Sequence, residues 1–148
     1  MKENNSFKVY KMKKIVLILL SVWTLNSCSL NNDQPNYYFE VLPVESFTVP
    51  ESFDMNGIYE IKLTYKRPTD CYFQEGIYYE KSGQTRIIGI QTRVLENNDC
   101  MPLDEAPIEV KFNFECTPGN THYIFKFYKG EDANGNNIFE EVNIPVNY

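Results

Sequence analysis

The chain is poor in the residues that most often carry catalysis. Its 148 residues include one histidine, His122, one tryptophan, Trp23, and only seven glycines. A zinc site of His and Cys ligands or a Ser-His-Asp triad cannot be assembled with any specificity around that histidine, and no glycine-rich phosphate loop leads from a strand into a helix. Paired carboxylates for glycoside hydrolysis are available, but the acids are too numerous to single out a pair. We therefore expect no catalytic function and no cofactor.

Long hydrophobic runs are also lacking. The apolar stretch 15–25 is shorter than the roughly 20 residues that a membrane-spanning helix needs. It follows Lys13-Lys14 and ends in Leu25-Asn26-Ser27-Cys28, which resembles the lipobox of a bacterial lipoprotein signal peptide. The resemblance implies cleavage before Cys28 and attachment of a diacylglyceryl thioether to its sulfur. From the residues alone, a buried helix or an uncleaved anchor remains the alternative.

This resemblance divides the chain into a signal peptide at 1–27, a lipidated cysteine with a short polar tether at 28–36, and a domain at 37–148. Met12 begins a complete signal by itself, so residues 1–11 could precede the true start. Ser29, directly after the lipidated cysteine, is similar to residues that permit sorting to an outer membrane. We expect a membrane-anchored envelope protein there, with the choice between the periplasmic and the surface face left open.

Basic residues are scarce in what would remain after cleavage. The whole chain has 14 basic and 20 acidic residues. Residues 1–27 hold five of the basic residues and one of the acidic ones, so cleavage leaves nine against 19, a net charge of −10. Such a surface repels phosphate backbones, which excludes nucleic acid as a partner. Anionic lipid headgroups are equally poor partners, and membrane attachment would depend on the acyl chains.

From residue 37 onward the hydrophobic period is two, and helical spacing is not sustained. Apolar side chains alternate with polar ones along 59–66 and 108–115, as in strands with one wet face. Further strands are expected at 73–81, 86–95, 123–129 and 138–146, with a first strand at 37–49 that Pro43 interrupts. The pattern predicts an all-β fold, a seven-stranded antiparallel sandwich of two sheets.

The order of turns resembles a fibronectin type III domain of the immunoglobulin-like class. Segments 61–68, 76–83 and 117–125 are similar to its B, C and E-to-F regions, and Tyr65 stands near the place of its strand-B tryptophan. The resemblance implies that Tyr123 forms a tyrosine corner, with its hydroxyl bonded to backbone near Thr117. Such domains act as adhesion and spacer modules, and the fold by itself fixes no chemistry.

Three cysteines besides Cys28 would be exported to a compartment where disulfides persist. If strands alternate in direction, Cys71 and Cys100 lie at the same end of the sandwich and Cys116 at the other. Because bridged Cα atoms lie within about 7 Å, we predict a Cys71–Cys100 disulfide and an unpaired Cys116 directed inward behind Phe114. The alternative is that all three are reduced and buried.

The same strand order gathers the connections 67–71, 96–107 and 130–137 at one end, where carboxylates are in excess. The segment Asp132–Asn137 begins like a calcium loop, but Asn137 and Asn143 stand where the glycine and the bidentate glutamate belong. A hairpin turn at Asn134-Gly135 is the better interpretation, with weak calcium binding left open and no metal site assigned.

Tyrosines are the remaining candidates for binding. Tyr72, Tyr78 and Tyr128 fall in the outward register of their predicted strands, and aromatic residues are enriched at protein interfaces. They favour an accessory or adhesion module that binds another envelope protein, or alternatively a flat platform for sugar rings in a carbohydrate-binding module. The structural alternative is plain cross-strand packing. His122 is expected to point away from the core.

Overall fold

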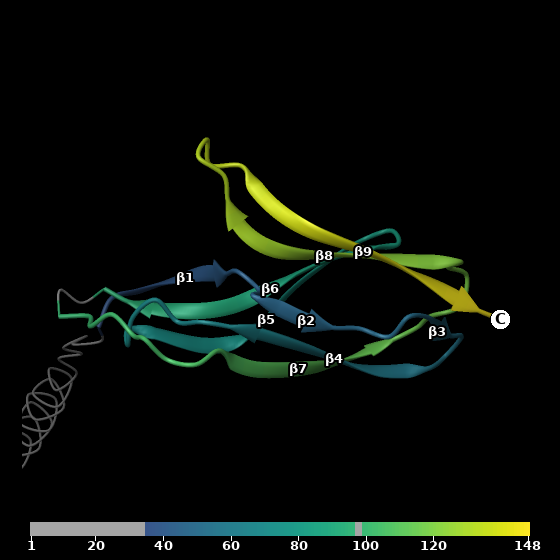
Figure 1. The fold of residues 1–148 in the computed structure, drawn as a ribbon, viewed down its shortest axis with the longest axis horizontal. Helices are drawn as coiled ribbons and strands as arrows, with labels where there is room; N and C mark the ends of the chain where they lie inside the picture. Colours follow the sequence, from purple (N-terminus) through teal and green to yellow (C-terminus); the bar gives the residue numbers. More distant parts are fainter. Residues whose placement is uncertain (1–34, 97–98) are drawn as a thin grey trace, which may run out of the picture. The chain divides into compact units, whose positions relative to one another are not determined.

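A computed structural model describes residues 35–96 and 99–148. The chain divides into two units, 1–34 and 35–148, and the second is the one described here (Figure 1). The predicted signal peptide, the lipidation of Cys28 and nearly all of the tether lie outside the described residues. Over the described ranges, the chain contains no helix of the length and apolarity that crossing a bilayer requires.

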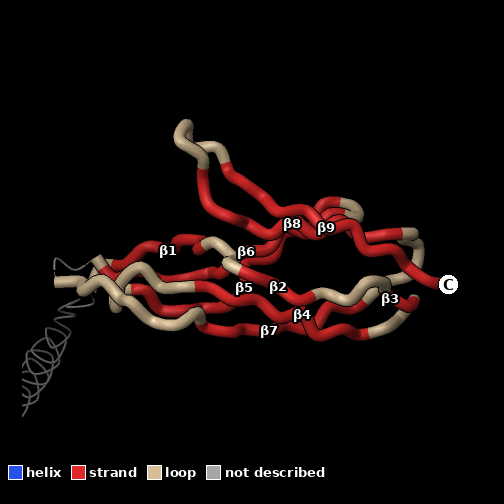
Figure 2. The backbone as a smooth tube through the Cα atoms, viewed as in Figure 1, coloured by secondary structure: helices blue, strands red, loops and turns tan. Residues whose placement is uncertain are grey.

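The described residues form nine β-strands and no helix (Figure 2). The strands are β1 (Tyr37–Leu42), β2 (Ser46–Thr48), β3 (Phe53–Asp54), β4 (Ile58–Tyr65), β5 (Tyr72–Ser82), β6 (Thr85–Leu95), β7 (Ile108–Glu115), β8 (His122–Glu131) and β9 (Asn137–Asn147). Six of them form one sheet, in the order β1-β6-β8-β9-β3 with β5 also paired to β6, and β2-β4-β7 form the other. The predicted all-β architecture of two sheets is confirmed.

The predicted strand count and directions are wrong in two respects. The structure has nine strands where seven were expected, and the pairs β6–β8 and β3–β9 are parallel. The predicted first strand is in fact two, because Pro43 has no N–H to continue a ladder. Before it, β1 pairs with β6; after it, β2 pairs with β4 in the other sheet. The two-residue β3, beside the end of β9, carries no alternation that could reveal it.

The strands with the clearest alternation pair as their pattern indicates. Strand β4 lies antiparallel to β7, with Ile61 opposite Phe112 and Leu63 opposite Val110. Ile61 and Leu63 are fully buried, whereas Glu60 and Lys62 between them are exposed. Lys111, on the same outer face, bonds Glu60 at 2.8 Å. This sheet therefore contributes one apolar face to the core, as predicted.

Aromatic rings fill the core where the two sheets close on each other. Phe53, Tyr123 and Phe125 are fully buried and Phe114 nearly so. Ring centroids lie 4.8 Å apart for Phe53 and Phe114 and 5.1 Å for Phe114 and Phe125. Such tilted and edge-on pairs add to the hydrophobic gain of burial. We call these four residues the aromatic cluster.

The tyrosine corner expected from the resemblance is present. The Tyr123 hydroxyl accepts hydrogen bonds from the Thr117 N–H at 3.0 Å and from Asn120 Nδ2 at 2.9 Å, and it donates to the Thr117 carbonyl at 3.2 Å. A buried hydroxyl needs such partners. The bonds fix the loop between β7 and β8.

The three cysteines of the domain are arranged as predicted. Cys71 and Cys100 form a disulfide with a Cα–Cα distance of 5.6 Å. Cys116 is unpaired and fully buried in the core. Its N–H donates to the Gly57 carbonyl at 2.9 Å, which anchors the end of β7 beside the turn before β4.

The sheet forks along β6. Strand β8 pairs only with residues Thr85 to Ile88 of β6. From Ile90 onward, the same edge of β6 pairs with β1 instead. A bulge between Tyr128 and Gly130, where Gly130 has φ of 102°, accompanies the divergence of β8. In Figure 1 the β8–β9 hairpin bends away from the sandwich beyond this point.

The fork overturns part of the predicted grouping of loops. Connections 67–71 and 96–107 do meet, through a bridge between Thr69 and Pro102 and the Arg67–Glu105 ion pair at 2.8 Å. The turn at 130–137 stands apart from them at the tip of the bent hairpin (Figure 1). The prediction was wrong here because alternating strand directions do not reveal that β8 leaves β6 after Phe127.

Candidate functional site

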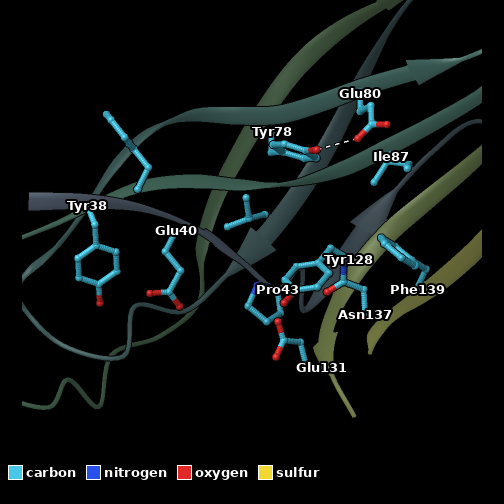
Figure 3. A pocket seen from close by; sticks show the side chains of 12 residues that line it. Tyr38, Glu40, Pro43, Tyr78, Glu80, Ile87, Tyr128, Glu131, Asn137 and Phe139 are labelled. Carbon is cyan, nitrogen blue, oxygen red and sulfur yellow. Dashed lines mark hydrogen bonds between the residues drawn. The ribbon is translucent and has the colours of Figure 1, made fainter. Parts of the chain in front are cut away.

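A cleft lies between β1 and the bent β8–β9 hairpin, with β5 and β6 as its floor. Its volume is about 790 Å³. Residues from all five strands or the segments that follow them line it (Figure 3): Tyr38, Phe39, Glu40, Val41, Pro43, Tyr78, Glu80, Ile87, Tyr128, Glu131, Asn137 and Phe139. A cleft of this size with aromatic walls and a few polar groups is the usual form of a ligand site.

The aromatic part of the lining is contributed by four strands. The Tyr128 ring on β8 lies 6.0 Å from the Phe139 ring on β9, tilted by 56°. Tyr78 projects from β5 into the same space, and Tyr38 and Phe39 from β1 are largely exposed. Burial is the main cause that raises the pKa of Tyr128, and the negative charges of Glu131 and Glu40 raise it further. These rings offer apolar faces beside negative charge.

Three carboxylates share the cleft with the rings. Glu80 accepts a hydrogen bond from the Tyr78 hydroxyl at 2.7 Å, which is the main cause that raises the pKa of Tyr78. Glu40 accepts one from the Tyr72 hydroxyl at 3.0 Å. None of the ion pairs found in 35–96 and 99–148 includes Glu40, Glu80 or Glu131. The described lining contains no Lys, Arg or His.

The fork depends on a glycine at its base. Gly89 on β6 pairs with Tyr78 of β5 and lies where β8 leaves and β1 arrives. A Cβ at this position would overlap Val41 Cγ1 and come within 3.6 Å of Tyr128 Cβ. The second distance is an ordinary van der Waals contact, so a residue without a side chain is required only for Val41 of β1 to approach β6 this closely. Gly89 therefore sets the position of the β1 wall of the cleft.

Two of the three predicted tyrosines line the cleft. Tyr78 and Tyr128 do, but Tyr72 pairs with Val94 and packs against the core. The predicted outward direction of Tyr72 was wrong because β5 contains a bulge between Gln74 and Gly76. The bulge inserts one residue and reverses the alternation, so that even-numbered side chains face the core before it and the cleft after it.

Sequence reasoning missed the contributions of β1 and β9. Tyr38, Phe39 and Glu40 lie on an edge strand whose neighbour across the cleft is distant in the chain, and Phe139 lies on the bent hairpin. The aromatic run Tyr37-Tyr38-Phe39, directly after the predicted tether, was the available signal. Consecutive side chains of a strand point to opposite faces, so three consecutive rings cannot all be buried on one face of a half-buried strand. At least one ring must therefore lie outside the core.

Other candidates from the sequence are occupied by structural contacts. The Asp132 carboxylate caps the hairpin turn, accepting from the Asn134 and Asn136 N–H groups at 2.8 and 2.9 Å. The hydrogen bond from the Asn136 side chain is the main cause that lowers the pKa of Asp132, and these two backbone bonds lower it further. The predicted turn at Asn134-Gly135 is confirmed, with φ of 80° at Gly135. His122 is half-buried, its Nδ1 3.1 Å from Thr121 Oγ1, on the face opposite the buried Tyr123.

Asp70, Cys71 and Cys100 are the one group of potential metal ligands that lie close together in the described residues. The two sulfurs are joined in the disulfide, and Asp70 Oδ1 accepts from the Met101 N–H at 2.8 Å. Metal binding by cysteine requires the thiolate, so this group is structural. The cleft, in contrast, combines aromatic rings with carboxylates that form no ion pair within the described part of the chain.

Comparison with known proteins identifies no relative: no family model, no curated protein and no solved structure matches the chain.

Proposed function

We propose that this protein is a non-catalytic recognition module of the bacterial cell envelope, anchored through acyl chains on Cys28, which binds a partner protein in the cleft between β1 and the β8–β9 hairpin. The observation that carries the proposal is the lining: five aromatic rings and three carboxylates, with no basic side chain. Aromatic anchors in a concave site dominate the energetics of protein interfaces.

The anchor rests on the lipobox-like sequence before Cys28. Dual acylation holds a protein stably at a membrane, whereas a single chain does not. We further assign the domain to the immunoglobulin-like class of sandwiches, most similar to fibronectin type III. The Tyr123 corner and the passage of the first strand from one sheet to the other support this assignment.

Photo-crosslinking in cells tests the binding site directly. We would insert p-benzoylphenylalanine in place of Phe139, which lines the cleft, and in a matched variant in place of Phe73, an exposed ring on β5 outside it. We expect a discrete protein adduct from position 139 and none from 73. Adducts from both positions, or from neither, would contradict a partner in the cleft.

A carbohydrate-binding module is the second candidate, because Tyr78 and Tyr128 share the cleft with carboxylates that can accept bonds from sugar hydroxyls. Glycan-array binding that disappears with Tyr78→Ala and Tyr128→Ala would favour this function over a protein partner. Membrane attachment is tested separately: labelled palmitate is expected on the native chain, and Cys28→Ala is expected to leave the membrane fraction.

A further inference from the structure

The carboxylates of the cleft are distributed in a regular way. Three strands each place a tyrosine and a glutamate two or three residues apart in its lining: Tyr38 and Glu40 on β1, Tyr78 and Glu80 on β5, and Tyr128 and Glu131 on β8. In Figure 3 the pair Tyr128 and Glu131 lies together, whereas Tyr38 with Glu40 and Tyr78 with Glu80 lie on opposite sides of β1, as the sheet register requires. Each pair sets a negative charge beside an aromatic ring.

These charges are not balanced from within the domain. Most basic side chains of the described residues form ion pairs elsewhere, as Lys126 does with Glu141 and Arg93 with Glu75. Lys129, the basic residue next to Tyr128, is held 3.1 Å from Glu140 and also donates to the Glu45 carbonyl at 2.9 Å. A ligand seated at Tyr128 therefore covers Glu131 without displacing a basic residue.

A neutral ligand would gain little from this arrangement. Covering carboxylates without pairing them costs free energy, because they lose water and gain no counter-charge. A lysine or arginine side chain supplies the counter-charge, and it is also attracted to the face of a tyrosine ring. Charge and ring together therefore favour a cation that carries an apolar stem.

We infer, resting on the proposed function, that the cleft binds a basic peptide segment of its protein partner and seats a lysine or arginine side chain at the Tyr128 ring, beside Glu131. At this position Figure 3 shows Glu131 beside Tyr128, and the Phe139 ring lies 6.0 Å from the Tyr128 ring. The acidic domain also speeds the approach of a basic partner by electrostatic steering.

The test is calorimetric titration of the full chain, purified in non-ionic detergent, with the peptide acetyl-Arg-Gly-Arg-Gly-Arg-amide. The matched probe replaces each arginine by citrulline, which keeps the shape and removes the charge. We expect the arginine peptide to bind at least about tenfold more tightly, a difference of roughly 1.4 kcal/mol. Raising the salt concentration from about 20 mM to about 300 mM should weaken it several-fold.

Variants locate the effect. Glu131→Gln and Tyr128→Ala should each weaken the arginine peptide about three- to tenfold, as expected for a lost ion pair or cation–π contact. Glu51→Gln, which removes the same charge from an exposed loop outside the cleft, should leave the affinity within twofold. Thermal melting by circular dichroism confirms that each variant is folded.

The outcomes separate this inference from the proposed function. Equal affinity for the arginine and citrulline peptides, or equal effects of Glu131→Gln and Glu51→Gln, would overturn the cationic ligand. Glycan-array binding that Tyr128→Ala abolishes and Glu131→Gln preserves would do the same and would establish the carbohydrate alternative. The absence of an adduct at position 139 would overturn the proposed protein-binding site itself.

Discussion

The two halves of β8 lie in different surroundings, although they belong to one continuous strand. In its first half Tyr123, Phe125 and Phe127 are fully buried between the sheets. In its second half Tyr128 and Glu131 line the cleft. The change occurs at the bulge after Tyr128, where β8 separates from β6. One strand therefore contributes both to the core and to the wall of the cleft.

The two ends of the sandwich are stabilised by different interactions. The closed region contains the aromatic cluster, the Tyr123 corner and the buried Cys116. The opposite end, where the loops 67–71 and 96–107 meet, is joined by the disulfide and the Arg67–Glu105 ion pair. Rings in the closed region therefore supply stability, whereas rings in the cleft stay partly exposed.

Truncating a ring in each region is the strongest test of this comparison. Phe53→Ala removes a fully buried ring that contacts Phe114, Tyr123 and Phe125, and should lower the free energy of unfolding by about 3–5 kcal/mol. Phe139→Ala in the cleft should lower it by less than about 1 kcal/mol. Urea denaturation measures both, and similar losses from the two variants would remove the distinction.

The disulfide should rank next. The double variant Cys71→Ser, Cys100→Ser releases a cross-link between positions 29 residues apart, which the chain-entropy model values at roughly 3–4 kcal/mol. Urea denaturation of this variant beside the native chain measures the loss. A loss below about 1 kcal/mol would mean that the ion pair and the Thr69–Pro102 bridge hold the two loops without it.

A smaller substitution addresses the fork itself. Gly89→Ala places a methyl group against Val41 of β1, and overpacking of this kind costs about 1–3 kcal/mol. Gly76→Ala on the neighbouring β5 is the matched control, because a Cβ there meets nothing within 4 Å. We expect only the first variant to lower stability and to weaken adduct formation at position 139. Equal effects would show that β1 is not held against Gly89.

How far the sequence predicted this fold depends on the range of the interactions. Alternation is a local property, so the strands at 59–66 and 108–115 and their buried faces could be read from residue types. The parallel pairing of β6 with β8 could not, because it joins segments nearly 40 residues apart and leaves no pattern in either one. After Pro43 the chain passes from one sheet to the other, and the sequence indicated this only as an interruption of the expected strand 37–49.

The candidate site was predictable in part for the same reason. The outward register identified Tyr78 and Tyr128 correctly, but the bulge at Gln74 and Gly76 reversed the direction of Tyr72. Glu40 and Glu131 could not be singled out among so many acids until the fork placed both of them near Tyr128. Their role depends on tertiary arrangement, which composition does not contain.

The smallest expected effect concerns alkaline stability, and it involves tyrosines from both regions. Burial is the main cause that raises the pKa of Tyr65, Tyr72, Tyr79 and Tyr128, and Tyr72 also donates to Glu40. In the unfolded chain tyrosines titrate near pH 10. Above that pH the unfolded chain loses protons that the folded chain keeps, so the free energy of unfolding falls as the pH rises through the folded values.

Below about pH 9 these tyrosines are protonated in both states and should contribute no pH dependence. Urea midpoints between about pH 8 and pH 11.5, with tyrosinate absorbance recorded in parallel, measure the effect. Tyr72→Phe should reduce the alkaline loss more than Tyr128→Phe, because the pKa of Tyr72 is raised both by burial and by its bond to Glu40. A urea midpoint that stays constant across this range would show that the tyrosine hydroxyls are accessible to solvent. This would include the Tyr72 hydroxyl, and its bond to Glu40 would then contribute nothing to stability.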